Sequence, residues 1–227
     1  MRTADWFETH FDYRFRRPEL LETALTHSSA GPDNNERLEF IGDAVLNFVI
    51  AVSVYRLRPE EHEGTLSRLR ANLVKGSSLA ALSADLSLGE RIMLGAGEQK
   101  SGGFQRRSIL ANALEAVLGA VYLDGGFEVA ERCVHRLFAE RLASLPEAAA
   151  LKDPKTRLQE HLQSLGLGLP VYELERVSGR AHEQTFEIAC SVVALGIRQL
   201  GSGTSRQRAE QAAAGRVLEE LGVNSIV

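Results

Sequence analysis

Three carboxylates lie inside the otherwise apolar stretch NNERLEFIGDAVLNF, residues 34–48. They belong to Glu36, Glu39 and Asp43, and their spacings of three and four residues place them on one face of a helix. Like charges at such spacings destabilise a helix by about 0.2–0.5 kcal/mol per pair. Surrounding apolar residues leave little room for a wide polar face, so these acids need an explanation. They form either a solvated face or a site with a partner of opposite charge.

A second apolar segment, ILANALEAV, adds two more polar side chains three residues apart, Asn112 and Glu115. If its helix packs beside the first, Glu39, Asp43, Asn112 and Glu115 surround one point. This set offers oxygen ligands only, which suit hard cations such as Mg²⁺ or Mn²⁺. A cation held there can activate water and stabilise charge on a phosphate.

Helices must position these groups, and the first part of the chain has helical periodicity throughout. Pro18 suits the first turn of a helix over residues 18–27, and a polar loop then precedes the acid-bearing helix, which runs towards Tyr55. Further helices are predicted from the apolar patterns at residues 63–75, 77–89, 108–126 and 127–145. The Gly-rich segment 94–108 is predicted to be a loop.

The pattern changes after residue 146. Residues 147–153 are typical of a linker, and a capped helix with Pro154 in its first turn follows. Three segments near residues 171–179, 183–192 and 194–203 alternate apolar and polar side chains, as strands do, and a last helix ends the region. The sequence therefore predicts an all-α domain over residues 1–146 and a small α+β domain, α-β-β-β-α, over residues 154–223.

Composition bounds the class of protein. The chain has 227 residues, 44% of them hydrophobic, and a formal net charge of −4. No apolar run reaches the roughly 18 residues of a membrane span, and the N-terminus has no apolar signal core. Cys133 and Cys190 lie far apart, which favours two buried thiols in a reducing cytoplasm. The acidic excess lies entirely before residue 152, where metal-binding carboxylates would contribute to it.

The stretch NERLEFIGDAVL resembles the signature motif of bacterial ribonuclease III. Other parts of the chain resemble that family in the same order, and they are THSS, GTLSRLRANLV, LGAGEQKSGGFQRRSILANALEA, KDPKTRLQEHLQ and GSGTSRQRAEQAAA. The resemblance implies a ribonuclease III fold, a double-stranded-RNA-binding domain and a homodimer with one active site per subunit in a shared valley. It implies cleavage of RNA duplexes by metal-activated water, leaving 5′-phosphate and 3′-hydroxyl ends with a short 3′ overhang.

The resemblance also assigns roles. Glu39, Asp43, Asn112 and Glu115 take the metal positions, and Asp43 and Glu115 carry catalysis. Glu36 takes a place in the dimer valley, where it handles substrate. Mg²⁺, with Mn²⁺ as a substitute, is the expected cofactor, and neither a small-molecule cofactor nor a membrane is expected. The expected substrates are structured ribosomal, messenger and transfer RNA precursors.

Binding of duplex RNA needs polar side chains that reach 2′-hydroxyls and phosphates across the grooves. The candidates are Gln159, Glu160, His182, Arg206 and Arg208. The last two open the final helix, where the helix dipole also favours phosphate. Each of the five has an ordinary alternative as a solvated surface residue.

Asn112 departs from the family, which most often has an aspartate at this position. An amide oxygen still coordinates Mg²⁺, but it carries no charge. One alternative function is therefore a duplex-RNA-binding regulator that no longer cuts. Another is a helical metal-dependent hydrolase of small nucleotides, which would not need the C-terminal α-β-β-β-α module.

Overall fold

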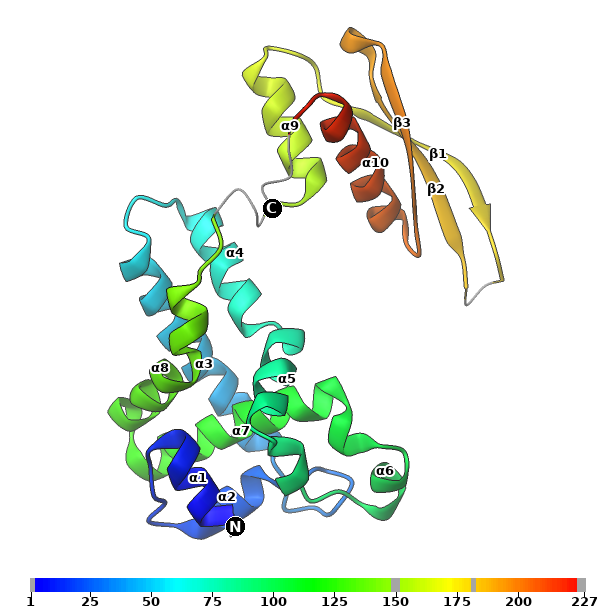
Figure 1. The fold of residues 1–227 in the computed structure, drawn as a ribbon. Coiled ribbons are helices and arrows are strands. Elements are labelled where there is room, and N and C mark those ends of the chain that lie inside the picture. Colours follow the sequence, from blue (N-terminus) through cyan, green and yellow to red (C-terminus); the bar gives the residue numbers. More distant parts are fainter. Residues whose placement is uncertain (1–2, 148–151, 181–182, 224–227) are drawn as a thin grey trace. The chain divides into compact units, whose positions relative to one another are not determined.

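A computed structural model describes residues 3–147, 152–180 and 183–223. The chain divides into two compact units, Met1–Leu145 and Pro146–Val227. The first unit is all-helical and the second is α+β, as the sequence predicted. Figure 1 shows the elements of each unit.

The helices of the first unit are α1 Thr3–Phe11, α2 Pro18–Ala24, α3 Glu36–Leu57, α4 Glu63–Val74, α5 Gly76–Asp85, α6 Ala96–Lys100, α7 Arg107–Gly125 and α8 Phe127–Ala143. Two 3₁₀ turns, η1 Leu88–Arg91 and η2 Gly103–Gln105, lie among them. The segment predicted as a plain loop over 94–108 therefore contains α6 and η2. Both elements are short, as expected where glycines interrupt helical periodicity.

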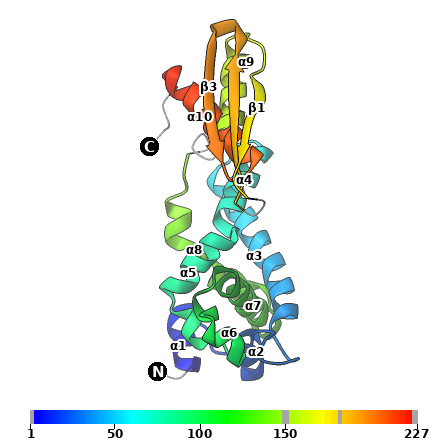
Figure 2. The ribbon, with the colours of Figure 1, turned by 90° about the vertical axis from the view of Figure 1, so that its right-hand side faces the viewer.

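Helix α7 forms the centre of the first unit. From Ile109 to Val121 its residues are buried except Asn112 and Glu115, which are half-buried. The long helix α3 makes its largest contact with α7, and Figures 1 and 2 show the two helices crossing. An apolar helix with two polar side chains at its crossing point is what the sequence pattern predicted.

Two glycines allow this crossing. A Cβ atom on Gly42 would lie 1.7 Å from the backbone carbonyl oxygen of Glu115, and a Cβ atom on Gly119 would lie 2.1 Å from that of Leu38. Only hydrogen fits at both positions, so the two backbones touch. Close backbone contact here brings the polar residues of α3 next to those of α7.

Helix α3 is less buried than its apolar sequence suggests. Leu46, Val49 and Ile50 are buried against the unit, whereas Phe40 is 79% exposed and Phe48 is 57% exposed. Phe40, an apolar neighbour of the acids, therefore lies on the outer surface of the single chain. Much of the apolarity of α3 belongs to an outer surface.

Helices α3 and α7 are long and apolar enough to span a membrane if length and composition alone are considered. Both helices contain charged residues, so neither is an uninterrupted apolar run. Since the two helices pack on each other in the first unit, this apolarity serves its core and the exposed face of α3.

Asp124, near the end of α7, holds the segment between α1 and α2. Its carboxylate accepts hydrogen bonds from the Tyr13 hydroxyl at 2.6 Å, the Arg16 amide at 2.7 Å and the Arg17 amide at 3.1 Å. The side chain of Asp124 is fully buried, so these donors replace the water it loses. The contact fixes the N-terminal segment to the central helix.

The second unit contains α9 Pro154–Ser164, β1 Val171–Ser178, β2 Thr185–Val192, β3 Ile197–Gly203 and α10 Arg206–Glu220, with a 3₁₀ turn η4 Val193–Leu195. The antiparallel sheet has the order β1-β2-β3, and both helices cover one of its faces (Figures 1 and 2). The core between helices and sheet consists of Leu158, Leu162, Cys190, Val192, Ala213, Ala214, Val217 and Leu218. All three predicted strands are present.

Candidate functional site

The crossing of α3 and α7 gathers four of the predicted site residues. Glu39 and Asp43 come from α3, and Asn112 and Glu115 come from α7. The Asn112 side chain donates a hydrogen bond to the Glu39 carboxylate, and the charges of Glu39 and Asp43 both act on Glu115. Residues more than 60 positions apart in sequence therefore share one polar cluster.

The negative charges of the cluster are poorly stabilised by their surroundings. Burial, and then the charges of Asp43 and Glu39, raise the pKa of Glu115 to about 7. Burial also raises the pKa of Glu39, and Glu36 and Asp43 add to this effect. The hydrogen bond from Asn112 and the nearby His27 act in the opposite direction. A bound cation would relieve the repulsion among these carboxylates.

Two neighbouring amides hold carboxylates of the cluster. Asn47, one turn along α3, donates a hydrogen bond to the Asp43 carboxylate at 2.8 Å, while Glu39 accepts from Asn112. Among the described residues, no three His, Cys, Asp or Glu side chains form a ready-made metal cluster.

The donor set nevertheless fits a hard divalent cation. It consists of three carboxylates and one amide oxygen, with neither sulfur nor imidazole. Asp43 is exposed, Glu39, Asn112 and Glu115 are half-buried, and the cluster is therefore open to solvent on one side. Such openness leaves positions for water and a phosphate oxygen.

Glu36 lies one turn before Glu39 and has a different setting. It is exposed and lines a groove of about 630 Å³ together with residues of α2, of the polar loop and of the end of α7. Its charge still reaches Glu39. The structure thus separates Glu36 from the crossing point, although spacing alone made it equivalent to the other acids.

The THSS segment contacts the beginning of α3. The backbone carbonyl of Thr26 accepts a hydrogen bond from the Asn35 amide, and the Ser29 hydroxyl accepts one from the Gly95 amide at 3.0 Å. His27 Nδ1 lies 2.8 Å from Ser29 Oγ and accepts from the Ser29 amide at 3.2 Å. The segment therefore joins the start of α3 to the loop that precedes α6.

Arg68 and Arg106, two basic residues of the first unit, have local partners. Arg106 forms an ion pair with Glu98, and Arg68 donates a hydrogen bond to Thr65 Oγ1 at 3.2 Å. Arg107 is exposed at the start of α7, and Arg70 is half-buried in α4. These local bonds hold Arg68 and Arg106 within the first unit.

Four of the five predicted RNA contacts lie on the helices of the second unit, and all four are exposed. Gln159 and Glu160 are on α9, and Arg206 and Arg208 open α10. Lys152 donates a hydrogen bond to Glu160 at 2.6 Å, and Arg208 Nη1 donates to the Thr204 hydroxyl at 3.1 Å. The fifth residue, His182, lies outside the described residues.

Sequence reasoning missed three residues that shape the cluster. Gly42 and Gly119 set the helix crossing, and Asn47 holds Asp43. A glycine in the interior of an apolar helix was the available signal for the first two, since it is unfavourable there unless backbones approach closely. Asn47 gave a weaker signal, as an amide one turn from an acid.

Comparisons with known proteins cover both structural units. A family model described as "Ribonuclease-III-like" matches residues 17–142, and one described as "Double-stranded RNA binding motif" matches residues 154–221. Ribonuclease 3 of Alkalilimnicola ehrlichii is 54% identical over 217 residues, which cover 96% of this chain and 95% of that protein. Ribonuclease 3 of Vibrio cholerae is 51% identical over 209 residues, 92% of this chain and 93% of that protein.

Solved structures extend the similarity to three dimensions. The nuclease domain of ribonuclease III from Campylobacter jejuni matches with a TM-score of 0.61 and 39% identity, over 64% of this chain and all of that one. A second structure of that nuclease domain matches with a TM-score of 0.59 and 41% identity, over 61% of this chain and 97% of that one. That second structure is described as showing structural flexibility in a region involved in dimer formation.

The small-nucleotide hydrolase considered above has no support in these similarities. Two family matches together span both structural units, and relatives above 50% identity cover nearly the whole chain. The chain belongs to the ribonuclease III family, whose members are metal-dependent endoribonucleases that act on double-stranded RNA.

Proposed function

We propose that the α3–α7 cluster is the active site at which this endoribonuclease hydrolyses phosphodiester bonds of duplex RNA. The observation that supports the proposal most is the meeting of Glu39, Asp43, Asn112 and Glu115 at the glycine crossing. Glu39, Asn112 and Glu115, with Asp43, are the ligands of Mg²⁺, for which Mn²⁺ can substitute. Asp43 and Glu115 are the catalytic residues.

When bound, the cation supplies Lewis-acid stabilisation of the phosphate and lowers the pKa of a water molecule. Water adds to phosphorus and the P–O3′ bond breaks, which leaves a 5′-phosphate and a 3′-hydroxyl. In the metal-free protein the pKa of Glu115 is raised to about 7, and a bound cation would keep this carboxylate ionised, as a metal ligand must be. Asp43 is exposed beside it, where a phosphate can approach.

The second unit binds the duplex in this proposal. Exposed polar side chains on α9 and basic side chains at the start of α10 suit 2′-hydroxyls and phosphates of A-form RNA. The contacts are made by Gln159, Glu160, His182, Arg206 and Arg208. Structured precursors of ribosomal RNA, some messenger RNAs and transfer RNAs are the substrates, and the cleavage products have a short 3′ overhang.

A homodimer is the working form. Phe40, Phe48 and Tyr55 are 79%, 57% and 68% exposed, and they follow one another along α3 at spacings of eight and seven residues. Such spacings keep large apolar side chains on one side of a helix, and a contiguous exposed apolar surface of this kind marks an interface. Two α3 helices packed on these faces would bring Glu36 of each subunit towards a shared valley.

The cytoplasm is the proposed location. Cys133 and Cys190 are both free and buried, so neither contributes a disulfide of the kind that proteins of oxidising compartments use.

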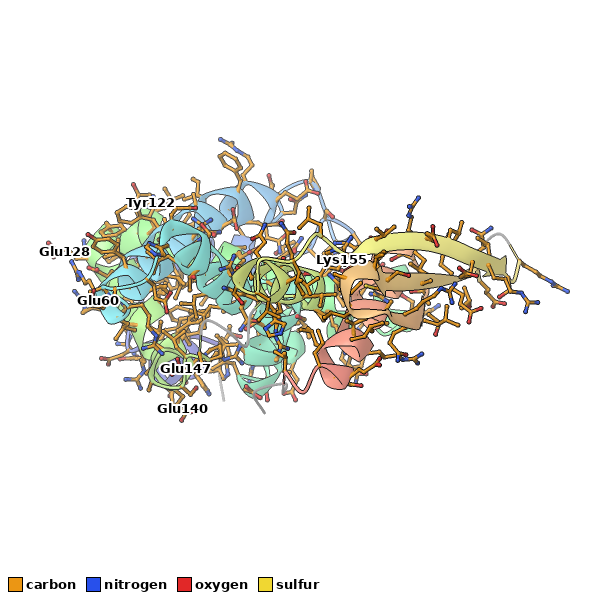
Figure 3. The ribbon with its side chains drawn as sticks, turned by 90° about the horizontal axis from the view of Figure 1, so that it is seen from above. Glu60, Tyr122, Glu128, Glu140, Glu147 and Lys155 are labelled. Atoms are coloured by element: carbon orange, nitrogen blue, oxygen red, sulfur yellow. The ribbon has the colours of Figure 1, made fainter. Side chains whose placement is uncertain are left out.

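The test uses long labelled duplex RNA, incubated with the protein in Mg²⁺, in Mn²⁺ and in chelator. Cleavage in the presence of either metal, none in chelator, and none by Glu115→Gln are the expected results. Glu140→Gln, at an exposed position of α8 labelled in Figure 3, is the matched control and should cleave normally. Binding without cutting under every metal condition would instead support the regulator, for which the neutral Asn112 is the relevant observation.

A further inference from the structure

Glu210 connects the two helices of the second unit through a single carboxylate. It lies on α10, four residues after Arg206, and its side chain is only 13% exposed. Its Oε1 accepts a hydrogen bond from Arg206 Nε at 3.1 Å, and its Oε2 accepts one from Lys155 Nζ at 2.6 Å. Each carboxylate oxygen therefore binds one positively charged side chain.

Lys155 comes from the first turn of α9 and is itself held in place; it is labelled in Figure 3. Its ammonium group lies 4.4 Å from the centroid of the Tyr172 ring, and its backbone amide donates to the Asp153 side chain that caps α9. The Lys155–Glu210 pair consequently joins the start of α9 to the start of α10.

Burial alone would raise the pKa of Glu210, but hydrogen bonds and charges from Lys155 and Arg206 lower it below its ordinary value. The carboxylate therefore stays ionised at neutral pH. Because the Glu210 carboxylate is shielded from water, its ion pairs with Lys155 and Arg206 are stronger than fully exposed ion pairs.

The two edges of the Arg206 guanidinium have different surroundings. Its Nε edge is used by Glu210, while 63% of the side chain stays exposed. The remaining edge of the guanidinium is open to solvent, and a guanidinium edge is well matched to a phosphate. Without Glu210, the long Arg206 side chain would be free to rotate in the unbound protein. Binding RNA would then cost the rotamer entropy that is lost when this side chain is fixed.

We infer that Glu210 is a positioning residue for duplex RNA: it fixes Arg206 with its free edge towards a phosphate, and Lys155 fixes Glu210. The inference rests on the proposed function, in which Arg206 contacts the RNA. It extends that function to Glu210, whose negative charge by itself repels the phosphates of RNA.

The sign of the effect separates positioning from simple electrostatics. If only charge mattered, removing the negative charge of Glu210 would tighten binding to a polyanion. If Glu210 positions Arg206, its removal weakens binding although the net charge becomes more positive. Glu210→Asp adds a sharper comparison, because it keeps the charge but shortens the side chain so that it cannot reach both partners.

The experiment measures the Kd of the full-length protein for a labelled RNA duplex in chelator, where no cleavage occurs, at salt concentrations from about 50 to about 200 mM. Glu210→Gln and Glu210→Asp should each weaken binding on the order of ten-fold. Each should also reduce the slope of log Kd against log salt by about 0.9, the value for one lost phosphate contact. Arg206→Gln should do the same, and combining it with Glu210→Gln should add little.

Glu219→Gln, an exposed glutamate near the end of α10, is the matched control for the change of charge and should retain the slope. Thermal melting of each variant checks folding, and the salt slope reports on the phosphate contact among variants that fold. Unchanged or tighter binding by both Glu210 variants, with Arg206→Gln weakened, would overturn the inference alone. Unchanged binding by Arg206→Gln would overturn the proposed RNA contact itself.

Discussion

At the scale of single residues, the cluster is a set of carboxylates with too little positive charge and too few hydrogen-bond donors around them when no cation is bound. Glu115 has a pKa raised to about 7, Asp43 is held by Asn47, and Glu39 is held by Asn112. The nitrogen of Asn112 donates to Glu39, and in the proposed site its oxygen would be a neutral ligand of the cation.

Asn112→Asp should lower the Mg²⁺ concentration needed for half-maximal cleavage, on the order of ten-fold, because an added negative charge strengthens cation binding. It should also destabilise the metal-free protein, since the hydrogen bond to Glu39 becomes a repulsion. Cleavage rates across a Mg²⁺ titration measure the first effect, and thermal melting in chelator measures the second. An unchanged Mg²⁺ requirement would show that residue 112 is not a ligand.

The raised pKa of Glu115 predicts a pH-dependent gain in stability for Glu115→Gln. Between the ordinary glutamate value of 4.5 and about 7, the folded metal-free protein binds more protons at this site than the unfolded chain does. Its free energy of unfolding therefore falls as pH rises through that window, and glutamine abolishes this loss.

Thermal melts in chelator, from a pH of about 5 to about 8, measure the difference between the two proteins. The difference in Tm should grow in favour of Glu115→Gln with rising pH and then level off. A constant difference across the series would contradict the raised pKa.

At the scale of elements, the site is a consequence of how two helices cross. The polar residues of α3 and α7 meet because Gly42 and Gly119 let the backbones touch. A side chain at either position would separate the helices and pull the ligands apart. Helix α7 is in turn anchored by Asp124, which holds the segment before α2.

Gly42→Ala should reduce cleavage on the order of 100-fold, because displacement of catalytic groups by about 1 Å is sufficient for such a loss. It should also destabilise the protein by about 1–3 kcal/mol, as overpacking does. Gly76→Ala is the control, since a Cβ atom there meets nothing within 4 Å. Cleavage kinetics and denaturant titrations measure both effects, and full activity in Gly42→Ala would refute the role of the crossing.

Asp124→Asn should lower the free energy of unfolding by about 2 kcal/mol at neutral pH, because a buried carboxylate accepts four hydrogen bonds there. Burial alone would raise the pKa of Asp124, but the bonds from Tyr13, Arg16 and Arg17 lower it. This stabilisation is therefore present above the ordinary value of 3.8 and is lost as pH falls through the lower folded value.

Urea titrations at neutral pH measure the loss for Asp124→Asn. Asp85→Asn provides a matched control, since Asp85 has a side chain that is 74% exposed and a longer ion pair with Arg141, and it should change stability little. Equal effects of the two substitutions would argue against the anchoring role of Asp124.

At the scale of the whole molecule, a nuclease unit and a duplex-RNA-binding unit share one chain. The exposed aromatic side chains of α3 form an apolar surface that a single copy leaves open to solvent. A second copy of α3 would bury them. Assembly is therefore part of the proposed function.

Light scattering should give twice the chain mass of 24.8 kDa for the unaltered protein. Phe40→Asp should shift the mass towards one chain, because a carboxylate would be buried without a partner in the proposed interface. Leu169→Asp, at a 60% exposed position of the second unit, is the control and should leave the mass unchanged. A monomer at micromolar concentration for the unaltered protein would contradict the homodimer.

The sequence by itself determined much of this protein. Helical periodicity and period-two alternation predicted the two fold classes, because each pattern matches the geometry of one kind of element. The signature stretch and the segment around Asn112 and Glu115 predicted which residues meet. Local spacing could do this because each pair lies on a single helix face.

Only the tertiary structure decided how those faces meet. Spacing made Glu36, Glu39 and Asp43 equivalent, and the crossing at Gly42 set Glu36 apart in a groove of its own. Phe40 is apolar and yet 79% exposed, because the path of α7 decides which side of α3 is covered. The bond of Glu210 to Lys155, 55 residues away, has no counterpart in any local pattern. Contacts between distant segments depend on packing, and packing is a property of the whole folded chain.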